Sequence, residues 1–164
     1  MRPCLLAILL LAASLCAAAA EADVAFEHPE AFTDVGRDRQ HAGRDEYLAT
    51  LREHLVQQAA RVLPATDKLE VRITDVDMAG DFEPWTGSRD DVRVLRPIDP
   101  PRIALRFRLL APDGSVRQEG ERRLVDQAYL RADDPRSSTD PLRFEKALLD
   151  LWLAREFTGR HAAR

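Results

Sequence analysis

Both cysteines of this chain, Cys4 and Cys16, lie in its apolar N-terminal stretch, so the rest of the chain has no thiol for a disulfide or a metal. The stretch has the three parts of an export signal: a short basic start, an apolar run over residues 5–16, and the small residues Ala17 to Ala20. It is shorter than the roughly 20 apolar residues of a membrane-spanning helix. We therefore expect residues 1–20 to be a cleaved signal peptide, and no stable membrane insertion after cleavage.

The remaining residues, 21–164, are enough for one domain, whose core we place at about residues 24–158. With 24 basic and 28 acidic residues, the chain has a formal net charge of −4 at pH 7. Nucleic acid is therefore not an expected partner, because binding it requires a basic face against the phosphates. The leader indicates a periplasmic or secreted protein, and Leu15 before Cys16 is not the small residue that lipid attachment requires.

Two segments have the periodicity of amphipathic helices. Apolar residues recur at three- and four-residue steps from Asp45 to Leu63, and Pro64 ends the pattern. A second apolar stripe runs to Gly159, after Asp140 and Pro141 in the order of a helix cap and a first-turn proline. We place Phe144, Ala147, Leu148, Leu151, Trp152 and Phe157 on its buried face.

Alternation of apolar and polar residues predicts strands with one buried face. It covers residues 69–74, 102–109 and 116–125, and residues 24–26 form a further short strand. The order strand, helix, strand, strand, strand, helix predicts an α+β fold: a small mixed or antiparallel sheet of about four strands with both helices packed on one face.

The last two strands flank Pro112-Asp113-Gly114 and form a hairpin. Its expected register pairs Arg108 with Glu119 and Arg106 with Glu121 on the outer side. The inner side of the last strand carries poor core material, which predicts an edge strand protected against further pairing; these residues are Gln118, Gly120 and Arg122.

A loop is expected from Asp75 to Asp91, and four acidic residues lie close together in it: Asp75, Asp77, Asp81 and Glu83. Carboxylates on a loop are the ligands of a hard cation such as Ca²⁺, but the spacing is not that of an EF-hand. Alternatively, they cap turns or pair with Arg89, Arg93 or Arg96. Asp75 and Asp77 are the catalytic candidates, with Asp77 first because Met78 and Ala79 follow it.

The same loop region is rich in large apolar and rigid residues. Phe82 and Trp85, with Pro100 and Pro101 further along the chain, either close one end of the core or, with Asp81 and Glu83, present a binding surface. We expect no cofactor, since the histidines follow no zinc pattern and neither a nucleophile elbow nor a phosphate-binding glycine loop occurs.

Several short motifs resemble those of a bacterial protein family, the domain of unknown function 3016. They are Phe32-Thr33-Asp34-Val35, the stretch from Asp75 to Trp85, Pro100-Pro101-Arg102-Ile103, Leu124-Val125-Asp126, and Phe144-Glu145-Lys146 before Trp152. The resemblance runs from about Val24 to Phe157 and implies a secreted bacterial protein, with no assigned activity and no catalytic residue. Phe144 departs from the family's Tyr-Glu-Lys pattern and lacks the tyrosine hydroxyl.

Export, one small domain and no recognised chemical motif together favour a periplasmic or secreted accessory domain that binds a partner in the cell envelope. The region from Asp75 to Pro101 is its expected contact surface. One alternative is an exported hydrolase or metal-dependent enzyme that uses the Asp75–Glu83 acidic loop; another is a purely structural envelope protein. The sequence favours binding over catalysis.

Overall fold

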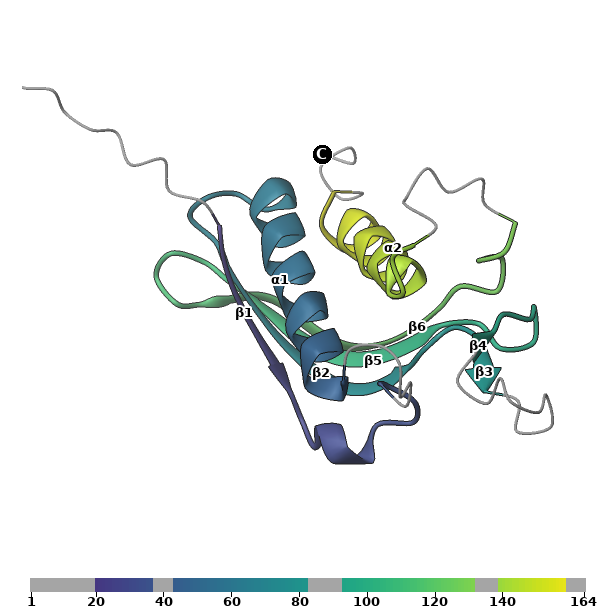
Figure 1. Ribbon diagram of the computed structural model, residues 1–164. Helices are drawn as coiled ribbons and strands as arrows, with labels where there is room; N and C mark the ends of the chain where they lie inside the picture. Colours follow the sequence, from purple (N-terminus) through teal and green to yellow (C-terminus); the bar gives the residue numbers. More distant parts are fainter. Residues whose placement is uncertain (1–19, 37–42, 83–92, 132–138, 159–164) are drawn as a thin grey trace, which may run out of the picture.

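The longest strands form one mixed sheet. The computed structural model describes residues 20–36, 43–82, 93–131 and 139–158. The sheet has the order β1-β2-β5-β6, and its strands are β1 (Glu21–Phe26), β2 (Lys68–Asp77), β5 (Arg102–Leu110) and β6 (Val116–Val125). β1 runs parallel to β2, whereas the other neighbours are antiparallel. The small pair β3 (Asp81–Phe82) and β4 (Arg93–Val94) lies near the end of β2 (Figure 1).

Both long helices cover the same face of this sheet (Figure 1). The chain passes from β1 through the short 3-10 helix η1 (Pro29–Ala31) to α1 (Arg44–Val62), which leads into β2. After the β5–β6 hairpin, α2 (Arg143–Leu153) continues directly as a π-helix, η2 (Ala154–Thr158). The predicted α+β class, the order of its main elements and the placement of both helices on one face are confirmed.

The core lies between the helices and the inner face of the sheet. Leu51 and Leu55 of α1 are fully buried, as is Ile73 of β2, because the helical and strand periodicities each direct one apolar row inward. Under α2, three aromatic rings meet edge to face: the Phe107 centroid lies 5.6 Å from that of Trp152 and 5.7 Å from that of Phe157. This cluster joins β5 to both α2 and η2.

The second helix differs from its prediction at its start and in its buried face. It begins at Arg143, because the Asp140 carboxylate accepts a hydrogen bond from the backbone N–H of Leu142 (2.9 Å) and holds a turn before the helix. Leu151, predicted to be buried, is 42% exposed, whereas Glu145 is fully buried. Both residues lie in the regular helix before the π-helix begins at Ala154, so their burial depends on which neighbours pack against α2 and not on a change of helical period.

β6 pairs only with β5 in the described part of the chain, as an edge strand should. The predicted pairs Arg106–Glu121 and Arg108–Glu119 are both in register. On the inner face, Arg122 donates two hydrogen bonds of 2.8 Å to the Glu156 carboxylate of η2, and Gln118 donates another. The polar inner face of β6 is therefore paired with the Glu156 carboxylate of η2.

Replacing Glu156 with alanine should destabilise the protein by about 1–3 kcal/mol, because Arg122 and Gln118 would lose their partner beneath η2. Urea unfolding measures this loss. The matched control is Glu119→Ala, which removes an exposed carboxylate from the outer face and should cost less than about 1 kcal/mol. Equal losses of unfolding free energy in the two variants would show that the inner-face contact stabilises the protein no more than the exposed ion pair does.

Candidate functional site

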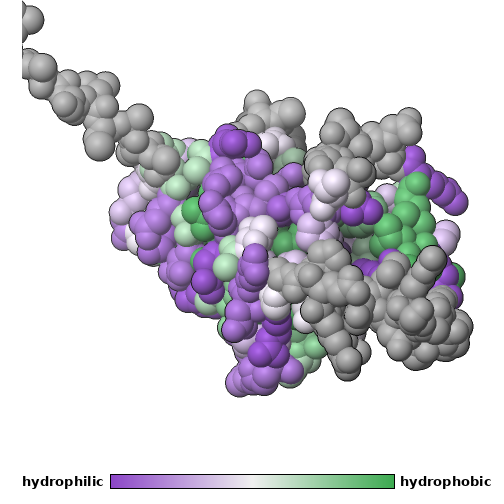
Figure 2. Space-filling view, in the orientation of Figure 1, coloured by the Kyte–Doolittle hydropathy of each residue, from purple (hydrophilic) through white to green (hydrophobic). Residues whose placement is uncertain are grey.

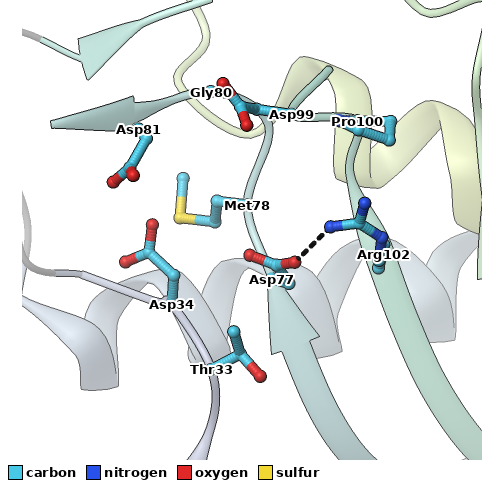
Figure 3. Close-up of a pocket in the computed structure, with 9 residues that line it drawn as sticks. All are labelled: Thr33, Asp34, Asp77, Met78, Gly80, Asp81, Asp99, Pro100 and Arg102. Carbon is cyan, nitrogen blue, oxygen red and sulfur yellow. Dashed lines mark hydrogen bonds and ion pairs between the residues drawn. The ribbon is translucent and has the colours of Figure 1, made fainter.

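A hollow of about 210 Å³ lies at the end of β2, where three segments of the chain meet (Figure 3). It is bordered by the residues after η1, by the connection from β2 to β3, and by the residues that lead into β5. The backbone joins two of them: Asp34 donates to the Val76 carbonyl (3.0 Å), and Met78 donates to the Asp34 carbonyl (3.1 Å). The lining residues are Thr33, Asp34, Asp77, Met78, Gly80, Asp81, Asp99, Pro100 and Arg102.

Asp75 and Asp77 belong to β2, so the prediction that a loop begins at Asp75 is wrong. The pairing register shifts between Ile73 and Asp75, and beyond this irregularity β2 stays paired with β5 as far as Asp77. The Asp75 carboxylate accepts hydrogen bonds from the backbone N–H and the hydroxyl of Thr33, at 2.8 and 2.9 Å. Both of its oxygens therefore hold the segment after η1 against the strand.

Asp77 forms an ion pair with Arg102 across the β2–β5 ladder, with 2.8 Å between carboxylate oxygen and guanidinium nitrogen (Figure 3). Figure 3 also shows the carboxylates of Asp34, Asp77 and Asp81 around the Met78 side chain. The hollow is thus rich in hydrogen-bond acceptors, since each carboxylate offers about four lone-pair sites. Its chemistry suits a ligand that donates hydrogen bonds.

Arg93, from β4, links the segment after η1 to the connection between β2 and β3. Its guanidinium lies 2.8 Å from an Asp34 carboxylate oxygen and donates to the Gly80 carbonyl at 2.7 Å. The side chains of Arg93 and Asp34 are only 16% and 10% exposed. The sequence offered Arg93 as a partner for nearby acids, whereas the only sequence signal for Asp34 is its place in the Phe-Thr-Asp-Val motif.

Glu145 ties α2 to the same region from the interior. Its side chain is fully buried, and one carboxylate oxygen accepts a hydrogen bond from the backbone N–H of Ala79 (2.8 Å). Burial raises the pKa of the Glu145 carboxyl above its usual value, against the opposing effect of that hydrogen bond. The only sequence signal for this residue is its place in the Phe-Glu-Lys motif, because a glutamate in a helix is normally expected at the surface.

Gly80 allows β4 to approach the end of β2. Its φ is +77°, and a Cβ at this position would lie 2.5 Å from the Val94 carbonyl oxygen. Its N–H donates to the Asp99 carbonyl at 2.9 Å. A left-handed, closely packed position of this kind requires glycine, so the backbone fixes the rim of the hollow.

The structure describes only some of the other predicted site residues. Asp81 lies in β3 and lines the hollow, and Phe82 also belongs to β3. Pro100 lines the hollow as well, but both Pro100 and Pro101 are buried. Glu83 and Trp85 lie outside the described residues, as do residues 1–19 of the predicted signal peptide.

In the described ranges, Asp, Glu and His residues form no group of three that could hold a metal ion. Within the same ranges, no helix has both the length and the apolar character needed to cross a membrane.

Comparison with known proteins gives distant structural similarities and one family. No curated protein matches the chain. A provisionally named lipoprotein from Caulobacter crescentus CB15 is 16% identical, with 84% of this chain and 85% of that chain covered and a TM-score of 0.37. A minor lipoprotein from Acinetobacter baumannii is 8% identical, with 87% and 92% covered and a TM-score of 0.28.

The family model described as "Protein of unknown function (DUF3016)" matches residues 20–155. The match spans β1 to the start of η2, which includes every element around the hollow and agrees with the resemblance of the short motifs. The chain belongs to the DUF3016 family.

Proposed function

We propose that this protein is an exported accessory domain of the bacterial cell envelope, and that it binds a partner protein through the hollow at the end of β2. The observation that carries the proposal is the way the hollow is built. Three separate segments form it, and hydrogen bonds and ion pairs hold its acidic side chains, such as Asp77 with Arg102. A surface ordered before binding loses less conformational entropy when a partner arrives.

The lining indicates the chemistry of the partner. Four carboxylates border the hollow, those of Asp34, Asp77, Asp81 and Asp99, and Arg102 is the one basic residue among the lining side chains. A lysine, arginine or side-chain amide of the partner would supply hydrogen-bond donors that match these acceptors. Binding is favoured over acid-base catalysis because Asp75, one of the two catalytic candidates, uses both of its oxygens to hold Thr33.

A pull-down from a bacterial envelope extract tests the proposal. The immobilised protein is expected to retain a partner, and Asp81→Lys should reduce the recovery by about tenfold or more, because a cation would face the donors of the partner. Glu53→Lys, on the exposed side of α1, is the matched charge reversal and should not change the recovery. Equal recovery with both variants would contradict a role for the hollow.

Two further measurements address the compartment and the enzymatic alternative. Fractionation should place the protein outside the cytoplasm, with its N-terminus at Glu21 after signal cleavage. Thermal melting with Ca²⁺, Zn²⁺ or EDTA should give one midpoint, since only a ligand of the folded state raises it. A metal-dependent rise that Asp77→Asn abolishes would favour the metal-dependent enzyme instead.

A further inference from the structure

Among the acidic residues that the structure describes, only Glu145 has no exposed surface. On the face of the molecule in Figure 2, most residues are hydrophilic, and a carboxyl at such a surface is hydrated in both of its charge states. Glu145 lies instead on the buried side of α2, where it contacts the connection from β2 to β3. The groups that surround it inside the protein therefore decide whether it carries a proton.

Glu145 has one hydrogen bond and no ion pair with any residue that the structure describes. Its Oε1 accepts the backbone N–H of Ala79 at 2.8 Å, whereas its Oε2 is buried with no hydrogen-bond partner in the same part of the chain. A carboxylate buried without a cation is costly, whereas a neutral carboxyl keeps its proton on Oε2 and still accepts through Oε1. The geometry therefore favours the neutral form, and burial raises the pKa of this carboxyl accordingly.

Three charged or titratable side chains face Glu145 from the elements around it, and each is bound elsewhere. Arg143, on α2 itself, donates to a backbone carbonyl and lies over the ring of the next residue. Tyr129, in the turn after β6, donates its hydroxyl to another backbone carbonyl at 2.7 Å. Arg93, from β4, forms its ion pair with Asp34. Loss of the proton would therefore leave an uncompensated negative charge in the interior.

Arg93 and Glu145 hold the same short segment, Met78 to Gly80. Arg93 donates to the Gly80 carbonyl at 2.7 Å and lies 3.4 Å from the Ala79 carbonyl oxygen. Glu145 holds the N–H of the same Ala79. Met78 and Gly80 both line the hollow (Figure 3). A movement of either side chain is therefore transmitted to the hollow through the backbone of this segment.

We propose that Glu145 is a positioning residue whose proton controls the shape of the hollow. While the carboxyl is neutral, it holds Ala79 in place and leaves Arg93 bound to Asp34. Once the proton has passed to the solvent, the buried carboxylate gains stability only by reaching water or a cation, and Arg93 is the cation that packs on the same segment. Either movement loosens residues 78–80. Partner binding then weakens as the pH rises, and this consequence alone rests on the proposed function.

Nuclear magnetic resonance of the purified protein tests the proposal without a partner. The reporters are the side-chain ¹³C carboxyl signal of Glu145 and the backbone amide of Ala79, followed as the pH rises from below the ordinary carboxyl pKa of 4.5. Both should titrate together above that value, and the protection of the Ala79 amide from hydrogen exchange should fall about tenfold or more. A Glu145 carboxyl that titrates at its ordinary value, or an Ala79 amide that does not follow it, would overturn the proposal.

Three variants separate the proton of Glu145 from a merely structural role. Glu145→Gln keeps an acceptor for Ala79 but does not titrate, so the protection of that amide should no longer depend on this transition. Asp34→Asn releases Arg93 and should lower the pH at which Glu145 titrates, because Arg93 can then stabilise the carboxylate. An unchanged titration of Glu145 in this variant would contradict the competition for Arg93. Glu53→Gln, at an exposed glutamate of α1, is the control and should titrate as wild type does.

A pull-down from envelope extract at the acidic and alkaline ends of this titration connects the proton to binding. Recovery of the partner by wild type should fall about tenfold towards the alkaline end, whereas Glu145→Gln should recover similar amounts at both and so controls for titration of the partner itself. An equal pH dependence in the two proteins would contradict control of binding by Glu145. Recovery of no partner at all would count against the proposed function instead, because the titration of Glu145 is measured on the protein alone.

Discussion

Replacing Arg93 with methionine is expected to destabilise the protein by about 3–5 kcal/mol, because the carboxylate of Asp34 would stay buried without its cation. The two side chains are largely enclosed, and Arg93 also donates to the Gly80 carbonyl beside the hollow. Methionine keeps much of the aliphatic volume of arginine, so the loss reports the charge and the hydrogen bonds. The free energy of unfolding in urea measures it.

The double variant Asp34→Asn/Arg93→Met separates the ion pair from packing. Removing both charges should recover part of the loss, since neither group then remains as an uncompensated buried ion. Arg106→Met is the matched control, because Arg106 pairs with Glu121 and Glu27 on the exposed outer face. Its loss should stay below about 1 kcal/mol. If Arg93→Met costs no more than this control, the ion pair does not support the hollow as we describe.

Replacing Glu145 with alanine is the second large effect that we expect, at about 2–4 kcal/mol. The backbone N–H of Ala79 would lose its acceptor inside the protein, and a cavity would remain below α2. Glu145→Gln keeps an acceptor oxygen at nearly the same volume and should cost much less. If the alanine and glutamine variants unfold at the same urea concentration, the hydrogen bond to Ala79 contributes nothing measurable.

The pH dependence of Glu145→Gln has a definite sign. Burial raises the pKa of the Glu145 carboxyl above its ordinary value of 4.5, so the folded state binds more protons than the unfolded state above that pH. The contribution of this group to stability is complete below the unfolded pKa and is lost as the pH rises through the folded pKa. Glutamine does not titrate. Wild type should therefore lose stability relative to Glu145→Gln as the pH rises above the ordinary pKa of 4.5, and a constant difference would contradict the burial of an ionisable group.

The elements that could be predicted from sequence are those with a strong local period. The helix α1 and the β5–β6 hairpin follow from apolar spacing, and the pairing of Arg108 with Glu119 follows from the alternation on either side of Pro112-Asp113-Gly114. Tertiary contacts overrode the local signal elsewhere. β2 continues through Asp75 and Asp77, two residues with low strand propensity, because Thr33 and Arg102 hold their carboxylates.

Within the candidate site, the acidic residues of one short stretch were predicted because they are close together in sequence, whereas Asp34 and Glu145 were not predicted. Asp77 and Asp81 both line the hollow. Asp34 is far from them along the chain, and Glu145 contacts Ala79 from α2. No periodicity connects such residues, since contacts of this kind exist only once the sheet, α2 and the segment after η1 have packed.

The sequence by itself determined an α+β class, the absence of cysteine after the apolar N-terminal stretch, and one face of each main element, because these depend on composition and on local spacing. The tertiary structure alone decided that a carboxylate on α2 would be buried and that Arg93 would pair with Asp34. It also left Leu151 exposed beside the β6 edge. Burial and pairing of polar groups are properties of the packed chain, because a side chain's neighbours in space are set by elements distant in sequence.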